Sequence, residues 1–447
     1  MTQFSYASLA PDFLSGKTSP SEFLETCLAR IAANENVVRA FVTLDIESAR
    51  RQAQDSTARW QAGQPLSAVD GMPVGVKDII ETVDMPTGQG SPLWENFESG
   101  RDSATVQALR DAGAIILGKT TTTEFASSPT FAETTNPHDP KRTPGGSSSG
   151  STAAVGAGFV PLALGSQVVG STLRPSSYCG CVGFKPSTGG INRSGSYDHL
   201  SHSCVGVIGT SLEDVWLSAK AIVTRVGGDP GYRGLTGPAN LPGAQTPKRL
   251  IVLQTDGWKR ITSGAHSAFE KVTEGLKEFG IELVDRHVDA EVDAFERMIE
   301  DVRSLSNIIL SWENRWPTAG YLRKDAGKVH PITVARFNEA KTLTQSDYIA
   351  ALEQRQALRD AFTIMIAKAD SAITLAATGA APQGLVSTGD PGFNIPASII
   401  GAPALSLPLL SDEGMPLGLQ VIGQRNEDAA LFGLATWITE WSGAYGR

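Results

Sequence analysis

Apolar and polar positions along the chain follow two spacings, which predict helices and strands. Residues 1–60 have the spacing of helices, and Ser19, followed by Pro20 and Glu22, has the composition of a helix start. Short apolar runs bounded by glycine or proline predict buried strands. Such runs occur at 71–80, 114–118, 159–169, 248–254, 281–288, 371–377, 404–410 and 418–423.

Helical spacing returns between these runs, and residues 224–247, rich in Gly and Pro, form a connector. Further helices are expected at 102–112, 151–158, 211–223, 264–279, 290–316, 344–369 and 427–441. Strands over the whole length predict one α/β domain rather than several small ones. Its expected parts are a helical segment 1–65, a core 66–225, a helical excursion near 290–370 and a return to the sheet at 371–447.

Composition places the chain among soluble globular proteins, with 41% hydrophobic and 19% charged residues. The net charge of −9, without a long basic run, disfavours nucleic acid as the main partner. The first residues lack the basic and apolar parts of a secretory signal. Four cysteines in 447 residues are expected to be reduced thiols, which indicates a cytoplasmic location.

A charge-free stretch from Thr143 to Leu173 is long enough to span a bilayer. Prolines at 144 and 161, with many glycines and serines, interrupt its apolar part. A buried helix followed by a buried strand explains the stretch better than a membrane span.

The most unusual part of that stretch is "PGGSSSGS", residues 144–151. A nucleotide-binding loop would need a lysine directly after its glycines, and a linker would continue as polar sequence. Two other interpretations stay open on the residues alone. The serines could cap the next helix, or "GSSSG" could be a hydrolase elbow with Ser148 as nucleophile.

A zinc site is the other candidate chemistry in this part of the chain. The residues that suggest it are Cys179, Cys181, His199, His202 and Cys204. Their spacings do not fit the paired ligands of zinc sites, so we expect no metal.

Three motifs in order carry a more specific signal: "GVKD" with Lys77, "PGGSSSGS" with Ser147, and "GSQVVGSTLRPSSYCGCVGFKP" with Ser171. Together with "GKTTTTEFA", "NPHDP" and the C-terminal "GAPALSLPL" and "GMPLGLQVIG", they resemble the amidase signature family over nearly the whole chain. "TTTTEFAS", "RPSSYCG" and "STGDPGFN" are most similar to malonamidase-type amidases. The resemblance implies a single α/β domain whose mixed, mostly parallel, twisted sheet is covered by helices on both faces.

The resemblance also implies a catalytic triad of Ser171, Ser147 and Lys77. Ser171 would attack the amide, and Ser147, after a cis bond from Gly146, would pass its proton to Lys77. Burial beside apolar neighbours would lower the pKa of Lys77, so that the neutral amine can act as a base. Asp78 would point to the opposite face if the strand continues there.

Further site residues follow from the same resemblance. The backbone N–H groups of Val168, Val169, Gly170 and Ser171 would form the oxyanion hole. Substrate contacts are expected from Arg174, Gly146, Ser148 and Thr122. In the malonamidase type the arginine holds a substrate carboxylate, whereas a structural ion pair is the alternative role. The pocket is expected to draw on residues 122–128, 199–203, 307–316 and 378–388.

Two departures from the family pattern affect the pocket. Many members have an aspartate where this chain has Gln167, and two glycines where it has Val169 and Gly170. The bulk of Val169 beside the oxyanion hole would narrow or redirect the acyl pocket.

The expected activity is therefore a serine amidohydrolase that needs no cofactor. It would cleave a small carboxamide through an acyl-enzyme, as an amidase acting on linear amides. One alternative is an aryl-amide or carbamate (urethane) hydrolase with esterase side activity. A second is one component of an amidotransferase for misacylated tRNA, which would need partner subunits; a third is a non-catalytic relative. The expected partner is a small-molecule amide or carbamate, with no nucleic acid and no membrane, and a homodimer is left open.

Overall fold

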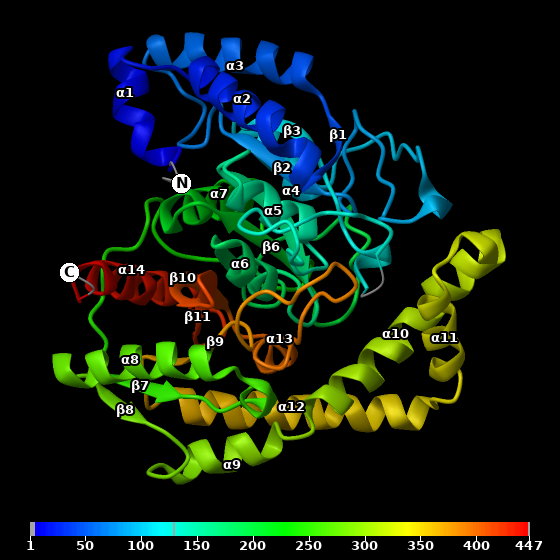
Figure 1. Cartoon of the computed structure of the whole chain (residues 1–447), viewed down its shortest axis with the longest axis vertical. Coiled ribbons are helices and arrows are strands. Elements are labelled where there is room, and N and C mark those ends of the chain that lie inside the picture. The colour runs from blue at the N-terminus through cyan, green and yellow to red at the C-terminus, as the bar shows by residue number, and fades with distance from the viewer. Residues whose placement is uncertain (1–4, 128–129, 446–447) are drawn as a thin grey trace.

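The computed structural model describes residues 5–127 and 130–445, which contain one sheet of eleven strands (Figure 1). Neighbouring strands follow the order β1-β3-β2-β4-β6-β5-β10-β11-β9-β7-β8. The strands are β1 Phe41–Leu44, β2 Pro73–Lys77, β3 Ile115–Thr120, β4 Leu162–Gln167, β5 Val182–Lys185, β6 Cys204–Gly209, β7 Arg249–Val252, β8 Glu282–Val284, β9 Ser371–Leu375, β10 Ala404–Asp412 and β11 Met415–Ile422.

Helices connect and cover these strands. They are α1 Ala10–Ser15, α2 Pro20–Val38, α3 Ile46–Gln61, α4 Ala104–Asp111, α5 Ser149–Gly156, α6 Leu173–Cys179, α7 Leu212–Val226, α8 Ser263–Phe279, α9 Ala290–Met298, α10 Val302–Asp325, α11 Pro331–Ala340, α12 Gln345–Ile366, α13 Ile395–Ile400 and α14 Asp428–Tyr445. Short 3₁₀ turns are η1 Ala7–Leu9, η2 Pro92–Trp94, η3 Glu124–Ala126, η4 Asp256–Arg260 and η5 Ala326–Lys328. Ser19 caps α2, with Pro20 in the first turn, as the sequence predicts.

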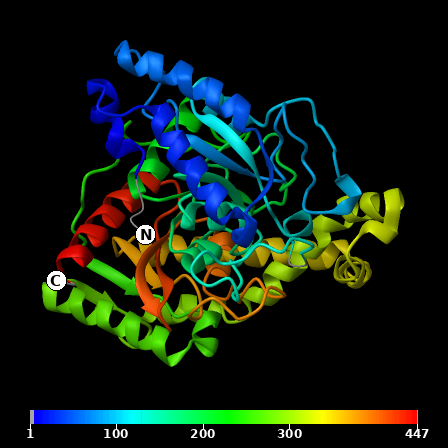
Figure 2. The ribbon, with the colours of Figure 1, turned by 45° about the horizontal axis from the view of Figure 1, so that its top comes forward.

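Both faces of the sheet are buried, because alternate residues of one strand enter different cores. In β3, Ile116 belongs to the largest hydrophobic cluster, whereas Ile115 and Leu117 pack with α2, α3 and α5. In β9, Ile373 faces the largest cluster and Ala372 faces a third one, formed with α9, α10, α12 and α13. In Figures 1 and 2, α10 and α11 extend to one side, away from the N-terminal helices. The expected helix-covered α/β domain is confirmed.

The balance of strand directions differs from the expectation of a mostly parallel sheet. Four neighbouring pairs are parallel (β2 with β3 and β4, and β7 with β8 and β9), and six are antiparallel. The reason lies in the connections. Between β10 and β11 only Glu413 and Gly414, both with positive φ, form the turn, which closes an antiparallel hairpin. Residues 186–203 join β5 to β6 without a helix.

Several elements escape the sequence pattern. β1 lies inside the segment expected to be helical, and β5 and β6 lie around a glycine-rich stretch that has no clear strand signal. The helix expected at 290–316 is divided into α9 and α10, and α10 continues through Pro317. The charge-free stretch forms the expected buried helix α5 and strand β4.

The parallel pairs at the N-terminal end of the sheet position the candidate site. β2 pairs with β4, with Val74 opposite Leu162 and Val76 opposite Leu164. The carboxyl ends of both strands therefore meet at the same sheet edge. Lys77 ends β2, and the chain from Gln167 to Ser171 leaves β4 at this edge.

Candidate active site

Lys77 is the most deeply buried member of the predicted triad, with no exposed side-chain surface. Its Nζ donates to Ser147 Oγ at 2.7 Å and to Ser166 Oγ at 2.8 Å. Burial lowers the pKa of Lys77 to about 7, and the nearby negative charge of Asp198 acts against this. Near neutral pH the amine is therefore poised to accept a proton from a serine hydroxyl.

Asp78 follows Lys77 but belongs to a different interaction. Its carboxylate lies 3.1 Å from Lys119 Nζ and accepts from the N–H of Gly88. Lys119 also donates to the carbonyl of Pro86. β2 ends at Lys77, so the strand does not continue through Asp78 as the expectation required. Lys119 lies opposite Val76 and Lys77 opposite Thr120, so the pair of Asp78 and Lys119 lies on the other face of the sheet. Lys77 is left without a paired carboxylate among the described residues.

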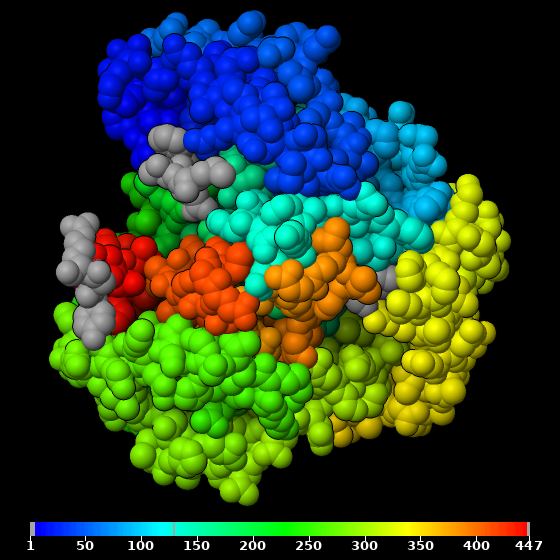
Figure 3. Space-filling model, viewed as in Figure 1, coloured from blue at the N-terminus to red at the C-terminus, as the bar shows by residue number. Residues whose placement is uncertain are grey.

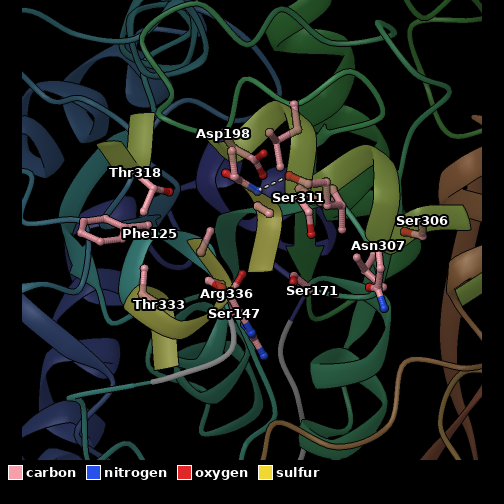
Figure 4. Close-up of a pocket in the computed structure, with 18 of the residues that line it drawn as sticks. Phe125, Ser147, Ser171, Asp198, Ser306, Asn307, Ser311, Thr318, Thr333 and Arg336 are labelled. Atoms are coloured by element: carbon pink, nitrogen blue, oxygen red, sulfur yellow. Dashed lines mark hydrogen bonds between the residues drawn. The ribbon is translucent and has the colours of Figure 1, made fainter. Parts of the chain in front are cut away.

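Ser147 lies in the loop that leads into α5. The peptide bond from Gly146 to Ser147 is cis, as the resemblance implies. Ser147 is 2% exposed, and it lines the same pocket as Ser171 (Figure 4). The structure therefore brings Lys77, Ser147 and Ser171 to one site.

The loop from Val168 to Ser171 is shaped by the side chain of Gln167. Gln167 Oε1 accepts from the N–H groups of Thr172 and Leu173, both at 2.9 Å. Its Nε2 donates to Ser398 Oγ, which in turn donates to the carbonyl of Val169 at 2.8 Å. The residue that departs from the family pattern thus ties the loop to α13.

Arg174 has a buried side chain that binds backbone oxygens rather than a carboxylate. Its Nη2 donates to the carbonyl of Gly146 at 2.6 Å, and its Nε donates to the carbonyl of Thr388 at 2.6 Å. Among the described residues Arg174 forms no ion pair, which was its alternative role; its hydrogen bonds instead join the Ser147 loop to the C-terminal segment. Figure 3 shows this segment, in orange, against the cyan surface of the chain before Ser147.

Three predicted substrate contacts lie outside the pocket lining. Ser148 is fully buried, and its hydroxyl bonds the backbone of Ser166, which also disfavours it as an elbow nucleophile. Thr122 Oγ1 donates to the neighbouring carbonyl of Thr123. Gly146 presents its carbonyl to Arg174. The polar groups of these three residues therefore bond protein partners rather than line the pocket.

The pocket that Ser147 and Ser171 share has a volume of about 560 Å³. Each of the four expected segments contributes to its lining. Val168, Val169 and Gly170 lie in its wall with Arg174. Other lining residues include Phe125, Ser127, Asp198, Arg303, Ser311, Arg315, Tyr321, Arg336, Phe337 and Glu339. The wall thus combines aromatic rings with several cations.

Two polar groups of the site escape sequence reasoning. Ser166 lies in β4, where every residue is buried, so nothing in the pattern separates it from a core serine. Asp198 lies in a loop without a motif of its own. A possible signal for Ser166 is its place in "GSQ", one residue before the unusual Gln167.

The cysteines considered as metal ligands face backbone oxygens instead. Cys179 Sγ donates to the carbonyl of Pro144, and Cys204 Sγ to that of Pro186. Among the described residues, no group of three His, Cys, Asp or Glu side chains could hold a metal ion. Within the same residues, no helix has the length and apolar character that crossing a membrane requires.

Known proteins resemble the chain over its whole length. Residues 22–432 match the family model described as Amidase. The A component of the glutamyl-tRNA(Gln) amidotransferase from Salinispora tropica is 29% identical, over 100% of this chain and 98% of the relative. The protein of the same name from Symbiobacterium thermophilum is 30% identical, over 95% and 93%.

Solved structures show the same fold. A crystal structure of an amidase superposes with a TM-score of 0.85 and 26% identity, over 98% of this chain and 99% of the other. A second structure was described with a vestigial protein complex that reveals the origins of an s-triazine catabolic enzyme. It has a TM-score of 0.84 and 27% identity, over 98% of both chains.

These findings correct the expected partners. The expected partner was a small-molecule amide or carbamate, with no nucleic acid and no membrane, and a homodimer was left open. That set is wrong as it stands, because relatives similar over the whole chain are named as subunits of an enzyme for glutamyl-tRNA(Gln). The names point to protein partners.

The buried amine of Lys77 should make stability depend on pH. The folded protein releases this proton near pH 7, whereas the unfolded chain keeps it until about pH 10. Between these values the unfolded state binds more protons, so the folded state gains stability as pH rises. Lys77→Met removes this gain.

The measurement is urea unfolding of the wild type and Lys77→Met between pH 6 and 9.5. The stability of the wild type relative to Lys77→Met should rise across this range. Lys271→Met, at an exposed position, is the matched control and should follow the wild type. Parallel curves for wild type and Lys77→Met would contradict the lowered pKa.

Proposed function

The chain belongs to the amidase family, and we propose that it hydrolyses a carboxamide C–N bond through an acyl-enzyme on Ser171. One observation carries the proposal: Lys77 is buried, has no paired carboxylate among the described residues, and donates to Ser147 Oγ at 2.7 Å. A lysine in this setting can act as a base, since burial lowers its pKa to about 7 and makes the neutral amine available near neutral pH.

In the proposed reaction Ser171 Oγ attacks the carbonyl carbon of the amide. Its proton passes to Ser147 as Ser147 gives its own proton to Lys77. The C–O bond forms, and the carbonyl electron pair moves onto oxygen, facing the N–H groups of the loop from Val168 to Ser171. When the pair returns, the C–N bond breaks and the proton travels back through Ser147 to the leaving nitrogen. Water then releases the acid by the same route.

The setting we favour is the amide-cleaving component of a larger enzyme. An amidotransferase must take its nitrogen from an amide, and the reaction above releases that nitrogen as an amine or ammonia. The whole-length similarity to amidotransferase subunits supports this setting. The resemblance to malonamidase-type amidases concerns the acyl group of the substrate. The proposed cleavage of the C–N bond is the same for either acyl group.

A second candidate is a hydrolase of aryl amides or carbamates, with esterase side activity. The observation that favours it is the aromatic part of the pocket wall. Phe125 and Tyr321 stack with ring centroids 4.2 Å apart, and Phe337 lies in the same wall. Such a wall can hold an aryl group by stacking and apolar burial.

Ser171→Ala should abolish amide hydrolysis while the melting temperature stays close to that of the wild type, since Ser171 is a half-buried loop residue. In the wild type, kcat/KM should rise with pH through about 7, because only neutral Lys77 accepts the proton. Both are measured by ammonia or amine release. Ser311→Ala, elsewhere in the wall, is the control and should stay active. Full activity of Ser171→Ala would exclude this nucleophile.

Arg174→Gln should lower kcat about 10- to 100-fold on malonamate, propionamide, an anilide and an aryl carbamate alike. The reason is that Arg174 positions the Ser147 loop through the carbonyl of Gly146, and small misplacements are costly. Arg336 is the matched control. It lines the pocket, donates to Ser127 Oγ and has no salt bridge within the described residues, so Arg336→Gln should affect malonamate most. If Arg174→Gln lowered kcat on malonamate alone, the result would indicate that Arg174 binds the substrate carboxylate.

The chain should copurify with protein partners when it is isolated from the organism that encodes it. A tagged chain is captured at low and high salt, and bound proteins and tRNA are identified and quantified. We expect at least one protein in stoichiometric amount, whose addition changes the rate of amide hydrolysis. A free chain with full activity and no partner would favour the second candidate.

A further inference from the structure

Asp198 is a buried carboxylate on the wall of the catalytic pocket (Figure 4). It is 5% exposed, and within the described part of the chain its Oδ2 has no hydrogen-bond partner. Among residues 5–127 and 130–445, its carboxylate also forms no salt bridge within 4 Å, although 23 such pairs occur there. A buried carboxylate without a donor is unfavourable, so the site favours a donor that enters the pocket.

The backbone of the loop that carries Asp198 is held by several hydrogen bonds, which keep this residue at the pocket wall. Arg193 Nη1 donates to the carbonyl of Leu200 at 2.8 Å and lies 3.4 Å from that of Asp198. Arg193 is itself held by Asp229 at 2.6 Å. The N–H of Ser201 donates to a carboxylate oxygen of Glu313 at 2.8 Å.

The cations near Asp198 do not fully balance its negative charge. Lys77 and Arg193 are the cations whose pKa values respond to Asp198. Arg193 is already paired with Asp229, and Lys77 must be neutral to act as the base. The negative charge of Asp198 is therefore least balanced in the form of the site that is ready to react. Glu339, another carboxylate of the lining, is exposed to water.

We propose that Asp198 binds a positively charged nitrogen of the substrate, and that the preferred substrates are amides carrying a protonated primary amine near the scissile bond. This inference rests on the proposed function, because it names the substrate class of the same site. In this arrangement Asp198 holds the ammonium group of the substrate, while the loop from Val168 to Ser171 holds the amide carbonyl.

The inference is tested with pairs of amides that differ in one charge. Glycinamide, 3-aminopropanamide and 4-aminobutanamide are compared with propanamide, butanamide and pentanamide, in which a methyl group replaces the ammonium group. N-(2-aminoethyl)acetamide and N-propylacetamide form the pair with the charge on the amine side. Binding is measured by calorimetry in Ser171→Ala, with and without Asp198→Asn, and kcat/KM is measured in proteins that keep Ser171.

We expect the charged member of at least one pair to bind about tenfold or more tightly than its neutral partner, the size of a charge-assisted hydrogen bond. Asp198→Asn should remove this preference and leave the neutral amides within about twofold of their original affinity. Glu339→Gln, the matched control in the same wall, should keep the preference.

Two results would overturn the inference: equal binding of charged and neutral amides in Ser171→Ala, or an equal loss on both in Asp198→Asn. If Asp198→Asn loses activity equally on charged and neutral amides and its pH profile is displaced, Asp198 acts only through Lys77 and does not bind the substrate. Binding preference without hydrolysis would reject the proposed function and keep the ammonium site. Hydrolysis without a preference for the charged amides would reject the ammonium site and keep the proposed function.

Discussion

A lysine amine buried without a carboxylate, among the residues that the structure describes, is the constraint on which the site depends. An ammonium group in such a place is disfavoured, so Lys77 stays only if its neighbours accept its hydrogen bonds without adding a full charge. Ser147 and Ser166 do this. Asp78, the next residue, is kept on the other side of the sheet by Lys119. The same arrangement that stabilises the neutral amine gives it a proton route to the pocket.

The rest of the site is held by long-range contacts between backbone and side chain. Arg174 connects the Ser147 loop to Thr388, and Gln167 connects the loop before Ser171 to Ser398. Both are buried polar side chains whose hydrogen-bonding groups meet backbone or hydroxyl partners, which is the condition under which such groups rigidify a structure. The loops can therefore present N–H groups and hydroxyls in fixed directions although they have no regular secondary structure.

Much of the fold, and the grouping of Lys77, Ser147 and Ser171 at one site, could be predicted, because both leave local marks in the sequence. Ser19 and Pro20 mark a helix start, and apolar runs between glycines mark β3 and β11. β5 and β6 could not be predicted, since glycine-rich strands gain their stability from neighbours rather than from their own residues. The same holds for the site. Lys77 lies in a motif, but the part played by Ser166 depends on the pairing of β2 with β4. The partners of Arg174 depend on a segment 214 residues further on.

That distance has a consequence for the synthesis of the protein. A nascent chain that has emerged as far as α6 already contains Lys77, Ser147 and Ser171, yet neither Thr388 nor Ser398 has been synthesised. The strands that complete the middle of the sheet, β10 and β11, come later still. Because the loops of the candidate site receive their anchors from the last part of the chain, the site is complete only after the ribosome has nearly finished. A chain truncated before Thr388 carries the full set of reactive groups without the contacts that align them.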